Sequence, residues 1–393
     1  EIVRLKCEAK KYAWGRQGNE SLVFQLLQKT TDQPLNEEER YSELWMGTHP
    51  SGPSLIDATN QPLEEFLAGT PYSKLPFLFK VLSIDKPLSI QAHPDKKLAK
   101  KLHKNFPEIY KDPNHKPELA CALTPFQALC GFRPLPEIIS LIETRSTELY
   151  ELLGAPFFNS LAQSSHSNEE KLSALFTNFM KIPSDSVTQG VTKMMERIKK
   201  ISSPDEFDEL LLYINSHFPG DIGVFCAFLL QHVTLDVGES IFLGASLPHC
   251  YLSGNIIECM ACSDNVVRAG LTPKLKDAET LCSMLDYSQN EIPILRGTAV
   301  DSYCRLYPVP VDEFLLYRVL IDDSTVSEYT LARNENSPGI LLVIRGNSSL
   351  VSNAQKLSIS EGSVVFIPPK IDVSFADIGA LLEVYYCTCK NFQ

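Results

Sequence analysis

The chain has 393 residues, 44% of them hydrophobic, so it can bury a large core and is expected to divide into two or three domains. Its formal net charge of -12 argues against a protein that binds nucleic acid or an anionic membrane, because either partner needs a basic surface. The longest nearly apolar stretch, residues 222–230, is too short to span a bilayer. We therefore expect a soluble protein of the cytoplasm, in which the eleven irregularly spaced cysteines are reduced thiols.

Short apolar runs broken by proline and glycine fill residues 1–132, as in LPFLFKVL at 75–82, and this pattern is typical of β-strands and turns. From 133 to 220 the apolar residues instead recur at the spacing of one helix face, beginning with Leu135, Ile138, Ile139 and Ile142. The same spacing is repeated at 172–179 and 207–214. A helical insert in a mainly β protein is therefore expected.

Two helix starts within this insert can be predicted from capping patterns. Ser167 stands three residues before Glu170, which is the spacing of a capping box. Ser203 is followed by Pro204 and then by Glu206, so a capping serine, a first-turn proline and an acidic third position stand in order. We expect one helix to begin after Ser167 and another after Ser203.

After residue 220 the sequence is expected to return to strands. Residues 235–243 and 357–367 both read as strand, glycine-containing turn and strand followed by proline, as in the jelly rolls of cupins. The alternative is that any two β-rich segments share such a turn. The second copy has no histidine after its prolines, which predicts a jelly roll without a metal. The expected division is a β domain with the functional site at 1–132 and 221–290, a helical insert at 133–220, and a second jelly roll at 291–393.

Four residues form a candidate set of metal ligands. Gln91 and His93 stand two apart in an alternating run, so in a strand their side chains point to the same face. Glu118 follows a proline at the start of an apolar run, and His249 follows a proline after the strand-like residues 240–243. Two imidazoles, a carboxylate and an amide oxygen predict one zinc ion with positions open to water or substrate. The alternative is that these are ordinary polar groups with hydrogen-bond partners.

A second group of residues could bind an anion in this otherwise acidic chain. Residues 263–274 concentrate Asp264, Arg268 and Lys274 in what should be an irregular loop and a short strand. Arg268 could stabilise negative charge on oxygen or bind a phosphate with two hydrogen bonds. The alternative is a surface loop with an ordinary ion pair. Further charges and a hydroxyl for the same anion are available from Lys80, Lys116 and Ser89.

The motifs around these residues resemble the type I mannose-6-phosphate isomerase family, also called phosphomannose isomerases, within the cupin superfamily. The similarity runs in order over most of the chain, through YAWG at 12–15, ELWMGTHP at 43–50, LPFLFKVL at 75–82, PLSIQAHPDK at 87–96, HKPELACALTPF at 115–126 and the long motif at 248–274. The resemblance implies two cupin-type jelly rolls with a helical insert in the first. It also implies one zinc ion per chain, held by Gln91, His93, Glu118 and His249, and a catalytic Arg268.

The reaction implied by the resemblance interconverts mannose 6-phosphate and fructose 6-phosphate through a cis-enediol. Asp264 and Glu258 are the first candidates for the base that moves the proton between C2 and C1, and His115 or Lys116 for the acid that opens the sugar ring. The expected substrate-binding residues are Ser89, Lys80, Lys274, Tyr251 and Trp14. The resemblance further implies a monomer with a small sugar phosphate as its partner, supplying mannose 6-phosphate for GDP-mannose synthesis and glycosylation.

Two other functions remain open at the level of sequence. A metal-dependent cupin oxygenase would use a similar set of two histidines and a carboxylate with iron, and it would consume dioxygen. A sugar-phosphate sensor without catalysis could be built on the same fold. The cations near the candidate site and the glutamine ligand argue against the oxygenase, and the complete ligand set with Arg268 argues against the sensor.

Overall fold

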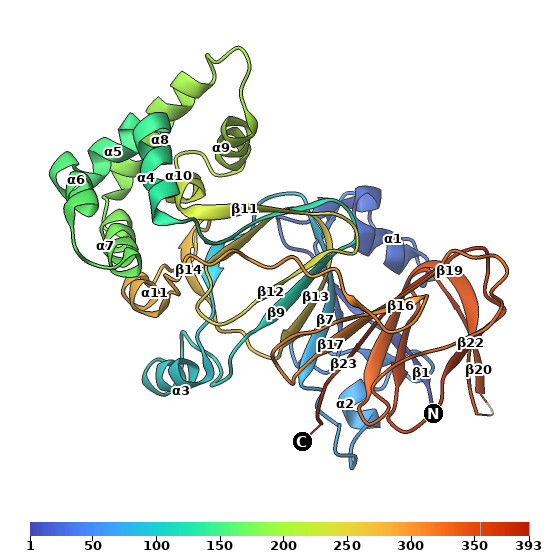
Figure 1. Ribbon diagram of the computed structural model, residues 1–393. Coiled ribbons are helices and arrows are strands. Elements are labelled where there is room, and N and C mark those ends of the chain that lie inside the picture. Colours follow the sequence, from blue (N-terminus) through green and yellow to red (C-terminus); the bar gives the residue numbers. More distant parts are fainter. Residues whose placement is uncertain (354, 393) are drawn as a thin grey trace.

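A computed structural model of the chain describes residues 1–353 and 355–392 and contains two large antiparallel sheet systems and a helical body (Figure 1). The fold class is as predicted: mainly β, with a helical insert. In Figure 1 the insert lies at the upper left, the C-terminal strands lie at the lower right, and the sheet that carries the candidate site lies between them.

The sheet system between these parts has 10 strands, with the path β11-β10-β13-β7-β5-β2. Its central strand is β13 (His249–Ala261), which pairs along its length with β7, β8, β9 and β10. The other strands of this system are β2 (Glu8–Lys10), β5 (Glu43–Met46), β7 (Phe77–Ile84), β8 (Ile90–Ala92), β9 (Glu118–Ala122), β10 (Phe126–Phe132), β11 (Leu230–Leu235), β12 (Ser240–Leu243) and β14 (Val267–Gly270). Because β13 touches so many partners, it fixes where their ends meet.

The second sheet system has 11 strands, and its path β15-β16-β17-β23-β19-β21-β1-β6 includes two strands from the N-terminal part of the chain. Val3 of β1 lies opposite Phe366 of β21, so this sheet does not follow the expected division at residue 291. Its strands are β1 (Val3–Lys6), β6 (Leu55–Ile56), β15 (Thr298–Ala299), β16 (Cys304–Tyr307), β17 (Leu315–Ile321), β18 (Tyr329–Thr330), β19 (Gly339–Ser352), β20 (Gln355–Ser360), β21 (Val364–Ile367), β22 (Ser374–Ala376) and β23 (Leu382–Thr388).

The turns of the two similar segments have the same backbone conformation. Gly238 joins β11 to β12 with φ +84, and Gly362 joins β20 to β21 with φ +85. Each glycine donates its N–H to a backbone oxygen of another strand. Gly238 donates to Ala122 of β9 and Gly362 to Val343 of β19, both at 2.9 Å. A left-handed residue is required at both turns, and glycine adopts this conformation with the least strain.

The insert consists of helices whose apolar faces share one core. They are α4 (Leu135–Arg145), α5 (Thr147–Leu153), α6 (Ala155–Gln163), α7 (Asn168–Met180), α8 (Ser184–Ile198), α9 (Glu206–His217) and α10 (Ile222–Leu229). The predicted start at Ser167 is confirmed: its hydroxyl accepts the N–H of Glu170 at 3.2 Å, and the Glu170 carboxylate accepts the N–H of Ser167 at 2.8 Å. The start predicted at Ser203 is wrong by two residues.

The residue that caps α9 is Asp205, which forms a capping box with Asp208. Aspartate caps a helix as well as serine does. Here Asp205 also accepts two hydrogen bonds from Arg145 of α4, at 2.8 and 2.9 Å. The contact between helices, which the local sequence does not reveal, fixes where α9 begins.

The strand expected directly after residue 220 is also incorrect, because residues 222–229 form α10. All of its residues are buried, and a short run that is apolar on every side cannot be assigned to helix or strand from periodicity. Asp221 caps the helix by accepting the N–H of Gly223 at 2.7 Å. α10 packs on α8 and α9, so it belongs with the insert.

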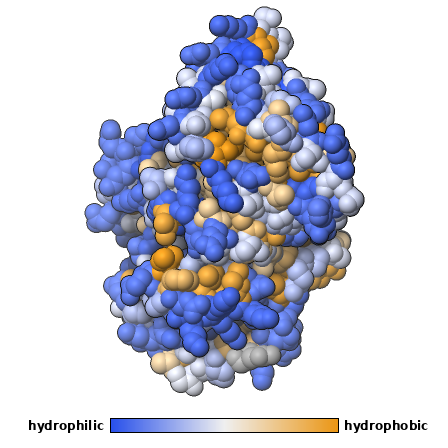
Figure 2. Space-filling view, turned by 90° about the vertical axis from the view of Figure 1, so that its left-hand side faces the viewer, coloured by the Kyte–Doolittle hydropathy of each residue, from blue (hydrophilic) through white to orange (hydrophobic). Residues whose placement is uncertain are grey.

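Shorter helical segments connect the strands: η1 (Gly18–Glu20), α1 (Leu22–Gln28), α2 (Leu63–Phe66), α3 (Lys96–Asn105) and α11 (Ala278–Met284). Among the described residues no helix has the length and apolar character needed to cross a membrane. The eleven cysteines are free thiols in the structure. Figure 2 shows a face with the insert at the top, where apolar side chains gather in a hollow below a hydrophilic tip.

The turn glycines give a test of how tightly the C-terminal sheet packs on the N-terminal part. A Cβ on Gly362 would lie 2.1 Å from the backbone oxygen of Leu26 in α1, whereas a Cβ on Gly69, at φ +83, would meet nothing within 4 Å. Gly69→Ala therefore carries only the strain of the left-handed conformation, about 1 kcal/mol. Gly362→Ala is expected to lower the free energy of unfolding by at least about 2 kcal/mol more. Urea unfolding of both variants measures the difference, and equal losses would contradict this packing.

Candidate active site

The predicted metal ligands lie where three strands of the central sheet system begin or end. His249 is the first residue of β13, Glu118 is the first residue of β9, and His93 directly follows β8. In the pairing of β8 with β13, Gln91 lies opposite His249. A proline directly precedes Glu118 and another directly precedes His249. Both prolines lie just outside the strands, so both side chains stand at strand starts, as the sequence indicates.

His93, Glu118 and His249 form the metal-capable group of the described residues, with one possible ligand atom of each within 4.8 Å of the others. The Glu118 carboxylate oxygens lie 3.3 Å from the Nε2 atoms of His93 and His249, and all three side chains are almost completely buried. Both Nε2 atoms and one carboxylate oxygen nevertheless lack a hydrogen-bond partner. Buried polar atoms without partners are costly, and here they face one another.

The second nitrogen of each imidazole explains this arrangement. Nδ1 of His93 lies 2.8 Å from the backbone oxygen of Asn265, and Nδ1 of His249 lies 2.9 Å from that of Leu247. A backbone oxygen can only accept, so each Nδ1 carries the proton and each neutral Nε2 turns a lone pair toward Glu118. Lone pairs and a carboxylate repel one another unless a cation lies between them. The residues therefore fit a divalent metal, with both histidines oriented by backbone acceptors.

The electrostatics of these three side chains agree with metal binding. Burial lowers the pKa of His93, which keeps its imidazole neutral. Burial alone would raise the pKa of Glu118, but interactions with its charged neighbours outweigh it and hold the pKa well below its usual range. Neutral imidazoles and an ionised carboxylate are the states in which these groups bind metals.

A cavity of about 680 Å³ opens beside the cluster. Most of the predicted site residues line it: Trp14, Lys80, Ser89, Gln91, Lys116, Glu118, Tyr251, Glu258, Asp264, Arg268 and Lys274. Gln91 lies opposite His249 and also opposite Arg268 in the pairing of β8 with β14. Its amide oxygen accepts a hydrogen bond from the Ser89 hydroxyl at 2.9 Å, so Ser89 orients the expected fourth ligand.

A buried charged network forms one wall of the cavity. The ammonium group of Lys80 lies 3.3 Å from Glu43 and 3.6 Å from Glu258, and 4.7 Å from the ring centre of Trp45. Burial alone would lower the pKa of Lys80, but the charges of Glu43 and Glu258 raise it, so the ammonium stays protonated. The Tyr251 hydroxyl donates to Glu258 at 2.7 Å. Burial, followed by the charge of Glu118, raises the pKa of Glu258 to about 7.

The other predicted catalytic groups differ in their surroundings. Asp264 is half-exposed, and its carboxylate lies 3.4 Å from Nε2 of His49, whose hydrogen bond lowers the pKa of Asp264. The ammonium group of Lys116 lies 3.9 Å from Glu118. The guanidinium of Arg268 makes no hydrogen bond or ion pair with any residue in the described part of the chain, whereas Asp264 of the same loop lies beside His49. The Arg268 guanidinium is available to a ligand.

His115 is not placed in this cavity. Its Nε2 bonds to the carboxylate of Glu313, and both residues line a separate pocket with Lys96 near the C-terminal part of the chain. His115 and Lys116 are adjacent in the sequence, yet His115 lines this separate pocket and Lys116 lines the cavity beside the cluster. This placement argues against the expected role of His115 as the acid that opens the sugar ring.

Sequence reasoning assigned no role to several residues of the cavity wall, notably Glu43, Trp45 and Tyr12. The signal for Glu43 was present: it is a charged residue in β5, a strand in which every residue is buried. An isolated charge in such a strand requires a partner of opposite charge. The partner, Lys80, lies in the neighbouring strand β7, whose position in the sheet was not known from the sequence.

The cluster predicts how histidine substitutions affect metal binding. His249→Ala removes one of the converging nitrogen atoms and is expected to lower zinc affinity more than about 100-fold. Loss of a residue that only hydrogen-bonds to a metal ligand already lowers metal affinity about 10- to 100-fold, and loss of the ligand itself should cost more. His232→Ala is the matched control, since His232 lies on the partly exposed strand β11 and its imidazole bonds to Gln127 of β10. Zinc content after dialysis against a weak chelator, and the rise in Tm on adding zinc, check both variants. Unchanged zinc content in His249→Ala would contradict the assigned cluster.

Comparisons with known proteins agree with the geometry. The family described as phosphomannose isomerase type I, catalytic domain, matches residues 2–135, and its helical insertion domain matches residues 153–230, ending just after α10. Mannose-6-phosphate isomerase 1 of Arabidopsis thaliana is 41% identical, with 94% of this chain and 90% of the relative covered. The Homo sapiens mannose-6-phosphate isomerase is 40% identical, with 95% of each chain covered.

Solved structures give the same result. A mannose 6-phosphate isomerase crystallised with zinc and yttrium superimposes with a TM-score of 0.84 at 28% identity, covering 99% of this chain and 100% of that one. A variant of phosphomannose isomerase from Salmonella typhimurium gives the same TM-score and identity over 100% of both chains. The similarity in sequence and structure covers the cavity, the insert and the C-terminal sheet. The chain belongs to the type I phosphomannose isomerase family.

Proposed function

We propose that this protein is a zinc-dependent isomerase that interconverts mannose 6-phosphate and fructose 6-phosphate through a cis-enediol. The observation that carries the proposal is the meeting of partnerless metal-binding atoms with a cation-lined cavity at the ends of β8, β9 and β13. His93, Glu118 and His249 would hold the ion, and Gln91 is the fourth ligand that we propose. When bound, zinc supplies a Lewis acid that polarises oxygen atoms of the substrate.

The proton transfer needs a base that is ionised near neutral pH. Of the two carboxylates that sequence leaves open, Glu258 fits better, because its pKa of about 7 balances ionisation against basicity. The pKa of Asp264 is lowered by its hydrogen bond with His49, so it is a weaker base. We therefore assign the transfer between C2 and C1 to Glu258. Lys80 and Tyr251 hold its carboxylate in place.

The cations have separate tasks in this proposal. Lys116, beside Glu118, is close enough to the metal cluster to give a proton to the ring oxygen as the sugar opens. Arg268, which has no partner of its own among the described residues, stabilises negative charge on the enediolate. Lys274, exposed at the edge of the cavity, is placed to meet the phosphate. Trp14, which also lines the cavity, supplies an apolar surface for the sugar.

We further propose that the enzyme acts as a monomer in the cytoplasm and supplies mannose 6-phosphate for GDP-mannose synthesis. The residues assigned to the reaction all come from one chain, so no second subunit is needed to complete the cavity. The free thiols support a reducing compartment.

Formation of fructose 6-phosphate from mannose 6-phosphate tests the activity. We expect turnover by the purified protein, its loss after chelation, and its return when zinc is restored. The control is the chelated protein restored with magnesium, a harder ion that suits this nitrogen-containing set poorly. No turnover with zinc present would contradict the proposal. Consumption of dioxygen would identify an oxygenase, and sugar-phosphate binding without turnover would identify a sensor.

Exchange of the substrate hydrogen at C2 with solvent tests the base. Glu258→Gln is expected to retain substrate binding but lose at least about 100-fold in exchange and kcat, whereas the matched Asp264→Asn loses much less. In the wild type, kcat/KM should fall as the pH drops through the pKa of Glu258, since the base must be ionised. That pKa should lie at or below about 7, because bound zinc offsets the charge of Glu118 that raises it. The opposite order of the two variants would assign the base to Asp264.

A further inference from the structure

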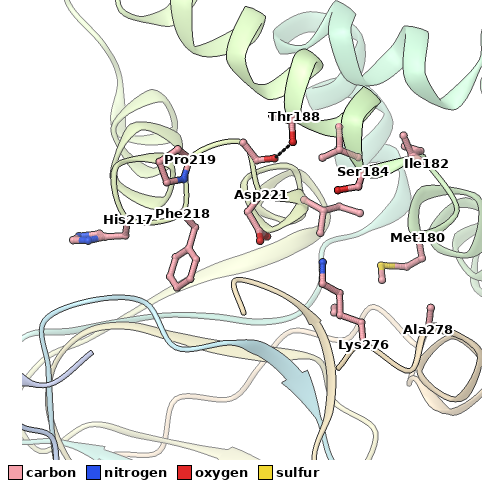
Figure 3. Close-up of a pocket in the computed structure, with 14 residues that line it drawn as sticks. Met180, Ile182, Ser184, Thr188, His217, Phe218, Pro219, Asp221, Lys276 and Ala278 are labelled. Carbon is pink, nitrogen blue, oxygen red and sulfur yellow. Dashed lines mark hydrogen bonds between the residues drawn. The ribbon is translucent and has the colours of Figure 1, made fainter. Parts of the chain in front are cut away.

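A second cavity, of about 500 Å³, lies between the insert and the back of the strand that carries Arg268 (Figure 3). It is lined on the insert side by residues of α7, α8 and the turn from His217 to Asp221, and on the other side by Ala269, Lys276 and Ala278. Phe218 lines both this cavity and the catalytic one. The wall between the two cavities is therefore thin, and residues 268–278 are not supported from behind by close packing along their whole length.

Asp221 makes the connection across this wall. Its Oδ1 atom accepts the N–H of Gly223 at 2.7 Å and the N–H of Leu271 at 2.9 Å. The first bond caps α10, and the second holds the residue directly after β14. In Figure 3 the Asp221 side chain points down from the insert toward the strands below. One carboxylate oxygen thus joins the start of a fully buried helix to the end of the strand that contains Arg268.

The backbone at this junction is strained and closely packed. Leu271 is buried and has φ +54, a left-handed conformation that costs a leucine free energy unless its surroundings hold it there. A Cβ on Gly223 would lie 2.3 Å from Cδ2 of Leu271, and a Cβ on Gly270 would lie 3.1 Å from Oδ1 of Asp221. The junction therefore depends on two glycines and one hydrogen-bonded carboxylate.

Arg268 depends on this junction because its side chain has no protein partner to hold it among the described residues. It stands in β14 opposite Gln91, but the register with β8 is irregular between Arg268 and Gly270, so the ladder does not fix the residues after β14. Leu271, Thr272 and Lys274, which come next in the chain, also line the catalytic cavity. A shift at Leu271 would move these residues together.

We propose that Asp221 is a positioning residue of the isomerase: by holding Leu271 against the start of α10, it keeps Arg268 at the distance from the substrate that its role requires. This inference rests on the role assigned to Arg268 under the proposed function. Asp221 itself lies behind the catalytic wall and does not line the catalytic cavity. Its effect is transmitted through the backbone of residues 268–271.

Asp221→Ala tests the proposal in the zinc-loaded, full-length enzyme. We expect kcat to fall at least about tenfold with unchanged zinc content, because displacements of about 1 Å can cost up to 100-fold in rate. Asp221→Asn should restore most of kcat, since its amide oxygen can accept the same two N–H groups. Hydrogen exchange should become faster at the amide of Leu271 in the alanine variant. Unchanged kcat, or unchanged exchange at Leu271, would overturn the proposal.

A second variant disturbs the junction without removing Asp221, the capping residue of α10. Gly223→Ala keeps Asp221, and alanine favours the helix, but the added methyl group displaces Leu271. We expect a fall in kcat similar to that of Asp221→Ala, and this test stands even where the alanine variant at 221 does not fold. Wild-type kcat in folded Gly223→Ala would overturn the proposal.

Two controls separate the possible causes of a loss. Asp205→Ala removes the capping aspartate of α9, which lies at the opposite end of this helix from His217 in the cavity wall, and should lower Tm without changing kcat. Loss of kcat in this variant as well would assign the effect to the stability of the insert and overturn the proposal. Arg268→Ala measures the role on which the inference rests: wild-type kcat there would refute that role and this inference together. A loss in Arg268→Ala beside wild-type kcat in Asp221→Ala would refute the inference alone.

Discussion

The buried carboxylate of Glu118 is the constraint around which this protein is arranged. It is 2% exposed and faces two imidazole nitrogens that cannot donate to it, because each ring gives its proton to a backbone oxygen. Removing a charged group from water costs several kcal/mol even after relaxation. A divalent cation turns this unfavourable arrangement into a binding site, so the strands that bring the three side chains together are arranged for metal binding at the expense of stability without metal.

The free-energy cost of burying charge also shapes the charged wall of the cavity beside the cluster. Glu43, Lys80 and Glu258 are all buried, and the single ammonium group lies between two carboxylates. Burial, followed by the negative charges of Glu118 and Glu43, raises the pKa of Glu258, because the single ammonium group of Lys80 does not balance all of them. The excess of negative charge that makes this region costly to fold thus provides a group that can exchange protons near neutral pH.

Much of the site could be predicted from the sequence because its residues stand at recognisable points of strands. Alternation predicted that Gln91 and His93 share one strand face, and prolines before Glu118 and His249 marked strand starts. What sequence could not provide was the pairing of distant segments. The buried charge of Glu43 is explained only by its ion pair with Lys80. The start of α9 at Asp205 is explained by the hydrogen bonds that Asp205 accepts from Arg145 of another helix. His115 bonds to Glu313 of the C-terminal part and therefore does not line the catalytic cavity. The apolar residues 222–229 gave no periodicity that separates a buried helix from a strand.

The pairing of β1 with β21 has a consequence for the order in which the chain can fold. Val3, Arg4 and Leu5 complete a sheet whose other strands come mostly from the last part of the sequence, so nearly the whole polypeptide must be present before this pairing can form. Contacts between such distant residues require closure of a very long loop and are slow to form. During synthesis the central sheet and the insert can gain their structure while the first strand is still unpaired. The C-terminal sheet is then the last part to close, and it joins the two ends of the chain.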